Sequence, residues 1–313
     1  MRILVTGGAG FIGSNLAQLL LAEGHEVGII DDLSTGKAEN VHASTWFREM
    51  SVLDAGLAES VTEFAPDAVV HLAAQVSVHE SMRDPERDRA INVEGTRAVA
   101  RAAAAAGARR VISASSAAVY GEPEVVPLPE TARKAPTNPY GASKLEAESV
   151  LAEELRPRGV DFASFRFSNV YGPRQDALGE GGVVAIFANR MVAGEPPAIF
   201  GDGLQTRDFI YVGDVVTAVL AALRVDSPLA QSGTDGHAFN VSTGTELSVE
   251  HLAETMREAA GYRGAVEHLP AREGDVERSA LDPTKAACVF GWRAAVPLER
   301  GVAMTVRWFS HGE

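Results

Sequence analysis

Three side chains near the middle of the chain have types and spacing suited to acid-base chemistry. Ser116 ends the apolar run "RRVISASS", and "NPYGASK" places Tyr140 and Lys144 four residues apart. Asn138 suits a helix N-cap and Pro139 suits the first helical position, so the phenol and the amine are predicted to share one helix face. An ammonium group beside a phenol favours the phenolate, which predicts that the pKa of Tyr140 is lowered from its reference value of ~10. Tyr140 could then act as a base, and Ser116 could hydrogen-bond the same substrate hydroxyl.

The residues around Ser116 narrow the chemistry further. In "SSAAVYG" the serine is followed by Ala117 and Ala118, so no carboxylate or histidine adjoins it. A hydroxyl, a phenol and a lysine suffice for reversible hydride transfer to a cofactor and for little else. The alternative is that Tyr140 and Lys144 lie on a solvated helix face by chance, while Ser116 only satisfies backbone groups at a strand end.

A glycine-rich turn supplies the expected cofactor site. In "TGGAGFIGS", Gly8, Gly10 and Gly13 follow the apolar run "RILVT" and open an amphipathic helix, in the order that binds a dinucleotide pyrophosphate at a helix N-terminus. Asp31 ends the next apolar run, where a carboxylate accepts hydrogen bonds from both ribose hydroxyls and repels a 2′-phosphate. NAD is therefore predicted rather than NADP. The alternative is a tight turn beside a solvated Asp31 and Asp32 pair.

Elements that could position these groups alternate along the first half of the chain. Strand-like runs ("RILVT", "EVGII", "DAVVHLA", "RRVISASS", "DFASFRF") alternate with helical stretches at 11–23, 86–106 and 139–155. This order predicts an α/β fold with a Rossmann-like, doubly wound parallel sheet. Residues 1–167 are predicted to form the dinucleotide-binding domain, which also receives part of 207–240. Residues 168–313, rich in Gly and Pro loops, are predicted to form mainly a smaller C-terminal substrate-binding lobe.

Composition excludes several classes of protein. A formal net charge of −14 argues against a nucleic-acid surface, which needs clustered Lys and Arg. The eight histidines are scattered, so no metal site is predicted. No apolar run approaches membrane-spanning length, and "MRILVTGG" lacks the pattern of a signal peptide. With Cys288 as the single cysteine, a disulfide framework is excluded and a cytoplasmic location is expected.

Seven motifs in a fixed order carry a family resemblance. They are "TGGAGFIG", "HLAAQ", "SSAAVYG", "YGASK", "RFSNVYGPRQ", "GDGLQTRDFIYVGDV" and "REGD". Between Met1 and about Trp292 the chain resembles the extended short-chain dehydrogenase/reductases of the NAD-dependent epimerase/dehydratase family that act on nucleotide sugars. Within that family it is most similar to the UDP-glucose (UDP-galactose) 4-epimerases.

The resemblance implies a mechanism and a set of site residues. Tyr140 would take the proton of the sugar 4-hydroxyl while hydride leaves C4 for a tightly held NAD, and Lys144 would hold the nicotinamide ribose. The 4-keto sugar would then turn over and take the hydride back on its other face. The implied cofactor-binding residues are Gly7, Gly10, Phe11, Ile12, Gly13, Asp31, Asp32, Ser34, Gly36, Val52, Leu72, Ala73, Ala74, Gln75, Asn92, Tyr140, Lys144 and Phe167. The implied substrate-binding residues are Ser116, Tyr140, Asn169, Val183, Val184, Arg207, Arg272, Asp275 and Ser279.

Departures from related enzymes guide the choice of reaction. The dehydratases and decarboxylases of this superfamily carry acidic residues where this chain has Ala117 and Ala118, so elimination is not expected. The 3,5-epimerising reductases need further acid and base groups, and Cys288 lies far from the relevant segments. Asn169 favours neutral hexoses over UDP-glucuronate, although a UDP-glucuronate 4-epimerase stays an alternative. So do a sugar dehydrogenase or reductase that releases its cofactor and a non-catalytic NAD sensor.

Two further expectations come from the resemblance. Ser279 aligns with a gate position that is small in enzymes accepting N-acetylated sugars, so tolerance of a 2-acetamido group is predicted. A homodimer is predicted through the helices at 86–106 and 139–155. Ser51 stands where many members have an adenine-binding Asp, with Asp54 three residues later, so an acidic contact to adenine is not expected.

Overall fold

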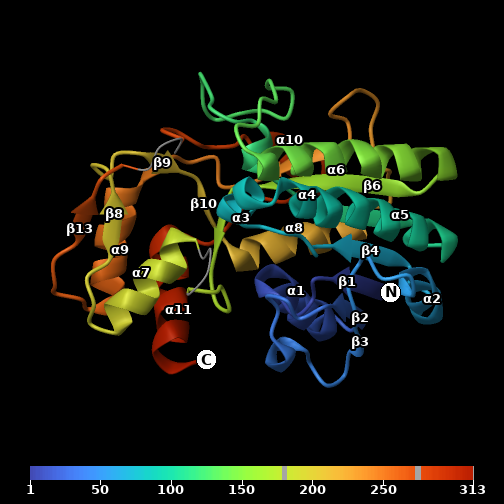
Figure 1. Cartoon of the computed structure of the whole chain (residues 1–313), viewed down its shortest axis with the longest axis horizontal. Helices are drawn as coiled ribbons and strands as arrows, with labels where there is room; N and C mark the ends of the chain where they lie inside the picture. Colours follow the sequence, from blue (N-terminus) through green and yellow to red (C-terminus); the bar gives the residue numbers. More distant parts are fainter. Residues whose placement is uncertain (178–181, 272–275, 313) are drawn as a thin grey trace.

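A seven-stranded parallel sheet forms the centre of the molecule (Figure 1). The structure is a computed structural model, and it describes residues 1–177, 182–271 and 276–312. The strand order is β11-β6-β5-β4-β1-β2-β3. The strands are β1 (Arg2–Thr6), β2 (Glu26–Asp31), β3 (Trp46–Glu49), β4 (Ala68–His71), β5 (Arg110–Ser116), β6 (Asp161–Phe167) and β11 (Ala238–Val241). The chain winds outward in both directions from β1 and β4, which confirms the predicted doubly wound α/β fold.

Helices cover both faces of this sheet, which explains its apolar strands. Residues of β1 and β4 are almost entirely buried, because a parallel sheet in this fold has no solvated face. One face packs against α2 (Leu57–Phe64), α5 (Gly95–Ala105) and α6 (Pro139–Leu155). The other packs against α1 (Phe11–Ala22), α8 (Val212–Arg224) and α10 (Thr284–Phe290).

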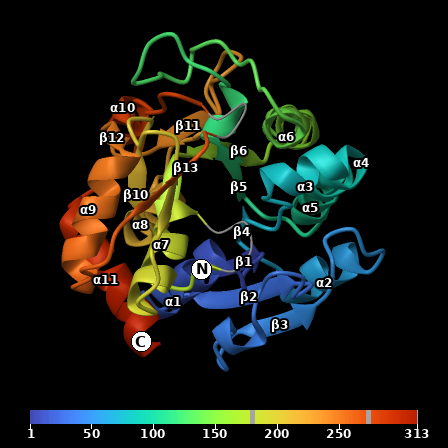
Figure 2. The ribbon, with the colours of Figure 1, turned by 60° about the vertical axis from the view of Figure 1, so that its left-hand side comes forward.

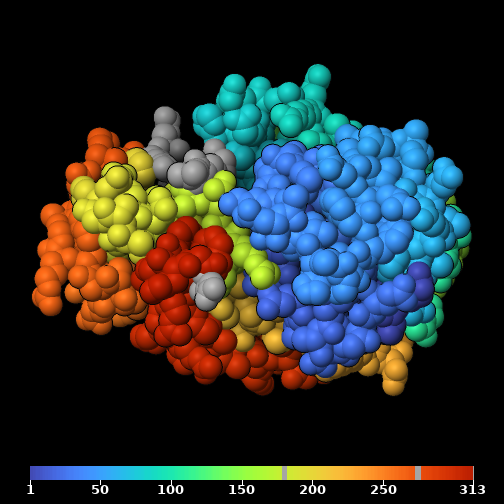
Figure 3. Space-filling model, turned by 90° about the horizontal axis from the view of Figure 1, so that it is seen from below, coloured from blue at the N-terminus to red at the C-terminus, as the bar shows by residue number. Residues whose placement is uncertain are grey.

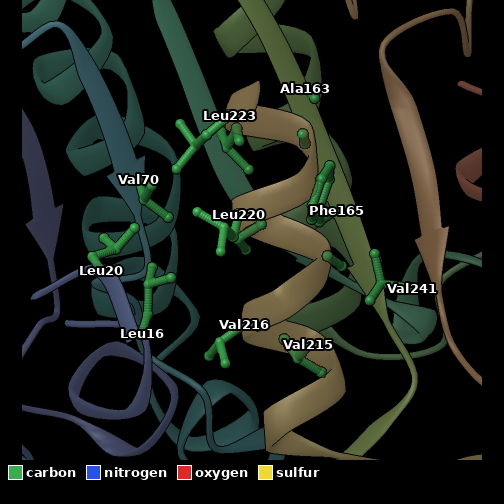
Figure 4. Packing of buried hydrophobic residues seen from close by; sticks show 14 of the residues in the cluster. Leu16, Leu20, Val70, Ala163, Phe165, Val215, Val216, Leu220, Leu223 and Val241 are labelled. Atoms are coloured by element: carbon green, nitrogen blue, oxygen red, sulfur yellow. The ribbon is translucent and has the colours of Figure 1, made fainter. Parts of the chain in front are cut away.

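The α8 face shows how the sequence builds this core. In Figure 4, Val215, Val216, Leu220 and Leu223 of α8 point toward the sheet, between Leu16 and Leu20 of α1 on one side and Phe165 of β6 on the other. All of them are nearly inaccessible to solvent. Because helix and sheet bury these side chains together, α8 and β11 lie with the sheet although they follow the lobe segment in the sequence.

The prediction of a helix over 86–106 is wrong in one respect, because the helical segment there is not continuous. It consists of α4 (Pro85–Arg89), a π-helical segment (Ala90–Glu94) and α5. Wide π turns are rare and often occur at functional sites. Here the π turn contains Asn92, which is 2 % exposed and faces α6.

A smaller lobe lies at one end of the sheet (Figures 1 and 2). Its helices α7 (Val183–Val192), α9 (Val249–Ala260) and α11 (Leu298–His311) share a separate apolar cluster. Its short strands are β7 (Asn169–Tyr171), β8 (Ala198–Phe200), β9 (Thr206–Arg207), β10 (Phe209–Tyr211), β12 (Leu247–Ser248) and β13 (Glu267–Leu269). Figure 3 shows the blue N-terminal part and the red C-terminal part in separate halves of one face. The domain boundary predicted at residue 167 falls where β6 ends, and it stays a prediction.

Membrane insertion of a helix finds no support among the described residues. None of the helices there is both long enough and apolar enough to cross a bilayer.

Candidate active site

The glycine-rich turn joins β1 to α1 at the carboxyl edge of the sheet. Gly7 has a φ of +72°, and a Cβ atom there would lie 2.6 Å from the backbone nitrogen of Ala73. A Cβ at Gly13 would lie 2.1 Å from the carbonyl oxygen of Gly7. Neither position accepts a side chain without moving the backbone. Gly10 is the N-cap of α1, and no side chain caps this helix, so the amides of Phe11 and Ile12 in its first turn face a site suited to an anion.

Asp31 ties the end of β2 to this turn. Its Oδ2 accepts a hydrogen bond from the backbone N–H of Ala9 (2.9 Å), and its Oδ1 accepts one from Leu33 (2.9 Å). Burial raises the pKa of the Asp31 carboxyl, and these two N–H donors oppose that rise. Gly36 is required nearby, because a Cβ there would lie 2.7 Å from Asp31 Oδ1. The carboxylate thus stands between the glycine turn and residues 33–36.

Other residues in and next to the expected cofactor site differ in their exposure and in their contacts. Asp32 is exposed and accepts hydrogen bonds from the backbone N–H (3.0 Å) and the hydroxyl (2.6 Å) of Ser34. Val52 is buried, and a Cβ atom at Gly95 would lie 2.9 Å from its Cγ2. Asp54 accepts a hydrogen bond from the N–H of Ser51 (2.9 Å), which closes a local turn.

The segment after β4 lies beside the glycine turn. The N–H of Leu72 donates to the carbonyl of Thr6 (3.0 Å), and the backbone of Ala73 lies against Gly7. Leu72, Ala73, Ala74 and Gln75 are all half-buried. Asn92 fixes this segment, because its Oδ1 accepts from the N–H of Gln75 (2.9 Å) and its Nδ2 donates to the Gln75 carbonyl (3.1 Å).

The three residues predicted for catalysis come together at the carboxyl end of β5. Ser116 ends β5, in register with Phe167 at the end of β6, while Tyr140 and Lys144 lie in the first two turns of α6. Ser116 also hydrogen-bonds the Tyr140 phenol. Lys144 is only 6 % exposed. The arrangement therefore places a hydroxyl, a phenol and an amine in one mostly buried site.

The start of α6 is held by two caps. Asn138 is the N-cap and accepts from the N–H of Gly141 (2.8 Å), with Pro139 in the first turn, so this prediction is confirmed. The N–H of Tyr140 donates to the Ser81 hydroxyl of α3 (Val78–Arg83) at 3.2 Å. The backbone that carries the phenol is thus fixed from a second helix.

The pKa of Tyr140 differs in direction from the sequence-based prediction. Burial raises the pKa of Tyr140, and the hydrogen bond from Ser116 only partly offsets that rise. Burial lowers the pKa of Lys144 to about 8, against the upward effects of Asp88 and Glu148. The prediction of a lowered phenol pKa is therefore wrong for the protein chain by itself, because desolvation outweighs the favourable contacts.

Part of the predicted substrate site gathers at the edge of the lobe. Asn169, Val183 and Val184 line one small pocket together with Gln175 and Phe209. The N–H of Asn169 donates to the carbonyl of Asp208 (2.9 Å), which pairs β7 with β10 at this point.

Two further predicted substrate residues lie close together: Arg207 is in β9, and Ser279 is in a segment that hydrogen-bonds β9. The guanidinium of Arg207 donates to the carbonyl of Thr206 (2.8 Å), and the N–H of Ser279 donates to the same carbonyl (3.2 Å). Arg272 and Asp275 lie outside the described residues.

Comparison with known proteins is decisive for the family. The sequence model of the NAD dependent epimerase/dehydratase family matches residues 3–242. The chain belongs to this family. UDP-glucose 4-epimerase of Mycolicibacterium smegmatis is 44% identical to it over 99% of this chain and 98% of the relative.

Solved structures of the epimerase/dehydratase family agree closely in fold. UDP-glucose 4-epimerase of Thermotoga maritima, solved with UDP-glucose, has a TM-score of 0.92 at 42% identity and covers 99% of this chain and 98% of its own. UDP-glucose 4-epimerase of Thermus thermophilus, solved with NAD, has a TM-score of 0.91 at 40% identity and covers 100% of both chains.

The observed geometry fits NAD, the cofactor that is part of the name of this epimerase/dehydratase family. Uncapped amides at the start of α1 suit a pyrophosphate, and Asp31 suits a ribose diol. Side chains at Gly7 or Gly13 would disrupt this turn. No group of three or more His, Cys, Asp or Glu side chains suited to a metal ion occurs within residues 1–177, 182–271 and 276–312.

Sequence reasoning missed several residues around the catalytic pair. Ser81, Asp88, Glu148 and Arg166 are all buried polar residues close to it. Asp88 precedes Asn92 by four residues and Glu148 follows Lys144 by four, so helical spacing alone indicates that each faces the same way as a known site residue. Gln175 and Phe209 of the lobe pocket lie inside two of the seven motifs, but their spacing alone did not indicate a role in the site.

Proposed function

We propose that this protein is a NAD-dependent 4-epimerase of a UDP-hexose, interconverting UDP-glucose and UDP-galactose through a 4-keto sugar. The observation that carries the proposal is the cluster of Ser116, Tyr140 and Lys144, followed on the strand-end turn by Ala117 and Ala118. The names of the relatives described above support the same reaction. Its class is an isomerase, because the cofactor returns to its starting state in each turnover.

The residues of the chain would hold and move one proton. Tyr140 takes the proton of the sugar 4-hydroxyl and later gives it back to the ketone oxygen. Ser116 hydrogen-bonds the same oxygen, since it already lies beside the phenol. The ammonium of Lys144 favours the phenolate form of Tyr140, which is needed because burial raises the pKa of the phenol.

NAD would be held along the carboxyl edge from the glycine turn to α6. When bound, it supplies the hydride acceptor and donor for C4. The pyrophosphate would be held by the first turn of α1, and the adenosine ribose by Asp31. Lys144 would hold the nicotinamide ribose, and Phe167 is in register with Ser116 at the strand end.

Elimination of water is disfavoured by the short turn that follows β5. Residues Ala117–Val119 form a 3-10 turn, and the Oγ of Ser116 accepts a hydrogen bond from the N–H of Ala118 (3.2 Å). A dehydratase needs an acid and a base beside the ketone, whereas two methyl groups stand at these positions. The site can therefore move the hydroxyl proton but has no group there to remove one from carbon.

The lobe residues support a neutral hexose, with room for a 2-acetamido group. Asn169 lies in the lobe pocket, and Ser279 offers a small side chain next to β9. Ser279→Tyr should lower the rate on UDP-N-acetylglucosamine at least tenfold relative to UDP-glucose, by filling the space for the acetamido group. Ser279→Ala is the matched control and should keep the ratio. An unchanged ratio in Ser279→Tyr would rule out this gate.

We also propose that two copies pair through the helical segments at 86–106 and 139–155. Ala100, Ala102 and Ala103 of α5 are buried in the protein's own core, so the small side chains of Ala98 and Ala105 on its other side would permit close helix approach. A cytoplasmic location is supported by the lone, exposed Cys288. Light scattering at working concentration tests the dimer, and a monomer there would contradict it.

The reaction itself is tested by proton NMR of three separate incubations without added NAD. UDP-glucose, UDP-N-acetylglucosamine and UDP-glucuronate are each mixed with the purified protein. The expected result is the 4-epimer of UDP-glucose without net NADH, which would support retained cofactor. Turnover of UDP-glucuronate in preference to the hexoses would favour the uronate 4-epimerase instead. No epimer from any of them, even with NAD supplied, would remove the proposal.

A further inference from the structure

A buried carboxylate with one unpartnered oxygen lies next to the catalytic helix. Asp88 of α4 is 1 % exposed, and its Oδ1 accepts hydrogen bonds from Gln75 Nε2 (2.7 Å) and Asn92 Nδ2 (3.2 Å). Its Oδ2 is buried and has no hydrogen-bond partner among the described residues. In that part of the chain Asp88 also forms no salt bridge. A buried charge in this condition is costly unless a counter-charge lies nearby.

The contacts of Asn92 link Asp88 to the helix that carries the catalytic pair. Nδ2 of Asn92 also donates to the hydroxyl of Ser143 (3.0 Å), which precedes Lys144, and the Ser143 hydroxyl donates to the carbonyl of Tyr140 (3.0 Å). The π turn around Asn92 lets residues of α4 and of the following turn face α6 together. Asp88 is therefore fixed in place relative to α6.

The cation on which the Asp88 charge acts is Lys144. Asp88 raises the pKa of Lys144 and, by the same negative charge, raises that of Tyr140. Lys144 has no salt bridge of its own among the residues described. Within that part of the structure, the Lys144 ammonium and the Asp88 carboxylate are thus two buried, opposite charges that each lack an ion-pair partner.

The charged groups elsewhere around the pair are already balanced. Glu148, one turn further along α6, is bound by Arg166 of β6 through two hydrogen bonds (2.9 and 2.6 Å). His71 of β4 is buried and neutral, because burial and Lys144 lower its pKa to about 3. On the outer surface, Arg89 of α4 pairs with Glu146 of α6.

We propose that Asp88 is a positioning residue for catalysis: its buried carboxylate is the counter-charge of the Lys144 ammonium and thereby fixes the protonation states of the Tyr140 and Lys144 pair. This inference rests on the proposed epimerase function. Epimerisation needs Tyr140 to lose and regain a proton while Lys144 stays charged. Removal of the Asp88 charge lets Lys144 lose its proton at a lower pH, and it lets Tyr140 lose its own at a lower pH as well. Both limbs of the activity profile should then move in the same direction.

Asp88→Asn is a suitable variant because it is close in shape. The amide oxygen can still accept from Gln75 and Asn92, and the amide nitrogen takes the place of the unpartnered Oδ2. The profile of kcat against pH should shift to lower pH by about one unit, since a nearby buried charge changes a pKa by that order or more. At alkaline pH the variant should therefore retain about a tenth of the wild-type rate.

The matched control is Asp84→Asn, four residues earlier in the chain. Asp84 is exposed and caps α4 by accepting from the N–H of Arg87 (2.9 Å), a bond that an amide oxygen can keep. The same charge is removed from the same segment. The profile of Asp84→Asn should coincide with that of the wild type.

A second readout does not depend on turnover. Ultraviolet titration of the phenol, as the difference between each protein and its Tyr140→Phe counterpart, should show a lower phenol pKa in Asp88→Asn than in the wild type. If Asp88→Asn fails to fold, Asp88→Ser is the second neutral variant, and the same shift is expected. A rate reduced equally at all pH values, with an unmoved phenol titration, would show that Asp88 is only structural and would overturn the inference. Absence of epimerisation by the wild type would instead remove the proposed function, while the titration would still decide the role of Asp88.

Discussion

Two buried carboxylates flank Lys144, and their surroundings differ sharply. Glu148 lies in a saturated polar cluster, where Arg166 forms a two-bond ion pair with it and Ser115 donates to its Oε1 at 2.5 Å. Asp88 accepts only neutral amide donors and, among the described residues, keeps one oxygen unpaired. The two carboxylates are similarly buried, but this does not give them the same role. Both carboxylates raise the pKa of Lys144, but Glu148 is also bound by Arg166, whereas Asp88 has no cationic hydrogen-bond partner among the described residues.

The Glu148 cluster extends well beyond the active site. Arg166 is 1 % exposed and also donates to the hydroxyl of Tyr120 (3.0 Å), the carbonyl of Glu130 (3.0 Å) and Asp235 (3.0 Å). Tyr120 and Glu130 lie in the connection between β5 and α6, and Asp235 lies in the connection between α8 and β11. The cluster thus joins β6 and α6 to the segments that cover this end of the sheet, which is a structural task.

The largest effect on stability is expected when Glu148 loses its ion-pair partner Arg166. Arg166→Met leaves Glu148 buried without a cation, so the free energy of unfolding should fall by about 3–5 kcal/mol, as is typical when one partner of a buried pair is lost. Urea unfolding measures this change. Arg101→Met is the control, because Arg101 is exposed and its partner Glu154 keeps Arg97 and Arg158 as ion-pair partners, so the unfolding free energy should change little. A loss of stability no larger in Arg166→Met than in Arg101→Met would break the distinction between the two carboxylates.

A smaller effect is expected from the third ionisable group beside Lys144. The hydroxyl of Thr96 donates to the carbonyl of Asn92 (2.6 Å), so it accepts from Nε2 of His71 (3.1 Å). Nδ1 of His71 then accepts from the hydroxyl of Thr6 (2.7 Å). This chain of bonds requires a neutral imidazole with its proton on Nε2.

The neutrality of His71 predicts a stability that depends on pH. Its pKa is about 3 in the folded state and about 6.5 when unfolded, so the unfolded chain binds the extra proton between these values. The free energy of unfolding should therefore fall by about 1.4 kcal/mol per pH unit as pH drops below 6.5. His71→Asn should lack this part of the slope, and His251→Asn, which removes an exposed histidine, should retain it. Equal slopes in His71→Asn and the wild type would show that His71 is not held neutral.

The smallest effect is expected from the cap on the catalytic helix. Ser81→Ala removes the acceptor for the N–H of Tyr140, which should cost about 1 kcal/mol of stability and lower kcat severalfold through a displaced phenol. Ser310→Ala removes a hydroxyl bonded to the carbonyl of Val306 (3.0 Å) in α11 and should leave kcat unchanged. Thermal unfolding and steady-state kinetics on both variants measure the difference. If Ser81→Ala lost stability but kept its full kcat, the cap would serve α6 without positioning Tyr140.

The same contrast explains what the sequence could predict. The alternation of strands and helices, the glycine turn and the start of α6 follow from local rules, because apolar patterns, glycine spacing and the Asn138 and Pro139 pair each act over a few residues. The continuous helix over 86–106 was wrong because composition does not show a π turn whose cause is the tertiary contact of Asn92 with α6.

The protonation of the site could not be predicted for a related reason. A neighbouring lysine predicts a lowered phenol pKa, but the direction in the folded chain is set by how much water the fold removes from Tyr140. The same holds for Asp88, because its missing partner is defined only when α4 and α6 are packed together. Residue spacing can be predicted from a short motif, whereas burial that depends on contacts distant in the sequence cannot.

The central claim is that this site removes and returns one hydrogen at C4 of the same sugar. The most direct test uses UDP-glucose deuterated at C4, incubated with the purified protein and followed by NMR. The UDP-galactose formed should retain the deuterium at C4 during the reaction, with none released to water. Loss of the label to solvent, or oxidation of the sugar with accumulation of deuterated NADH, would contradict it.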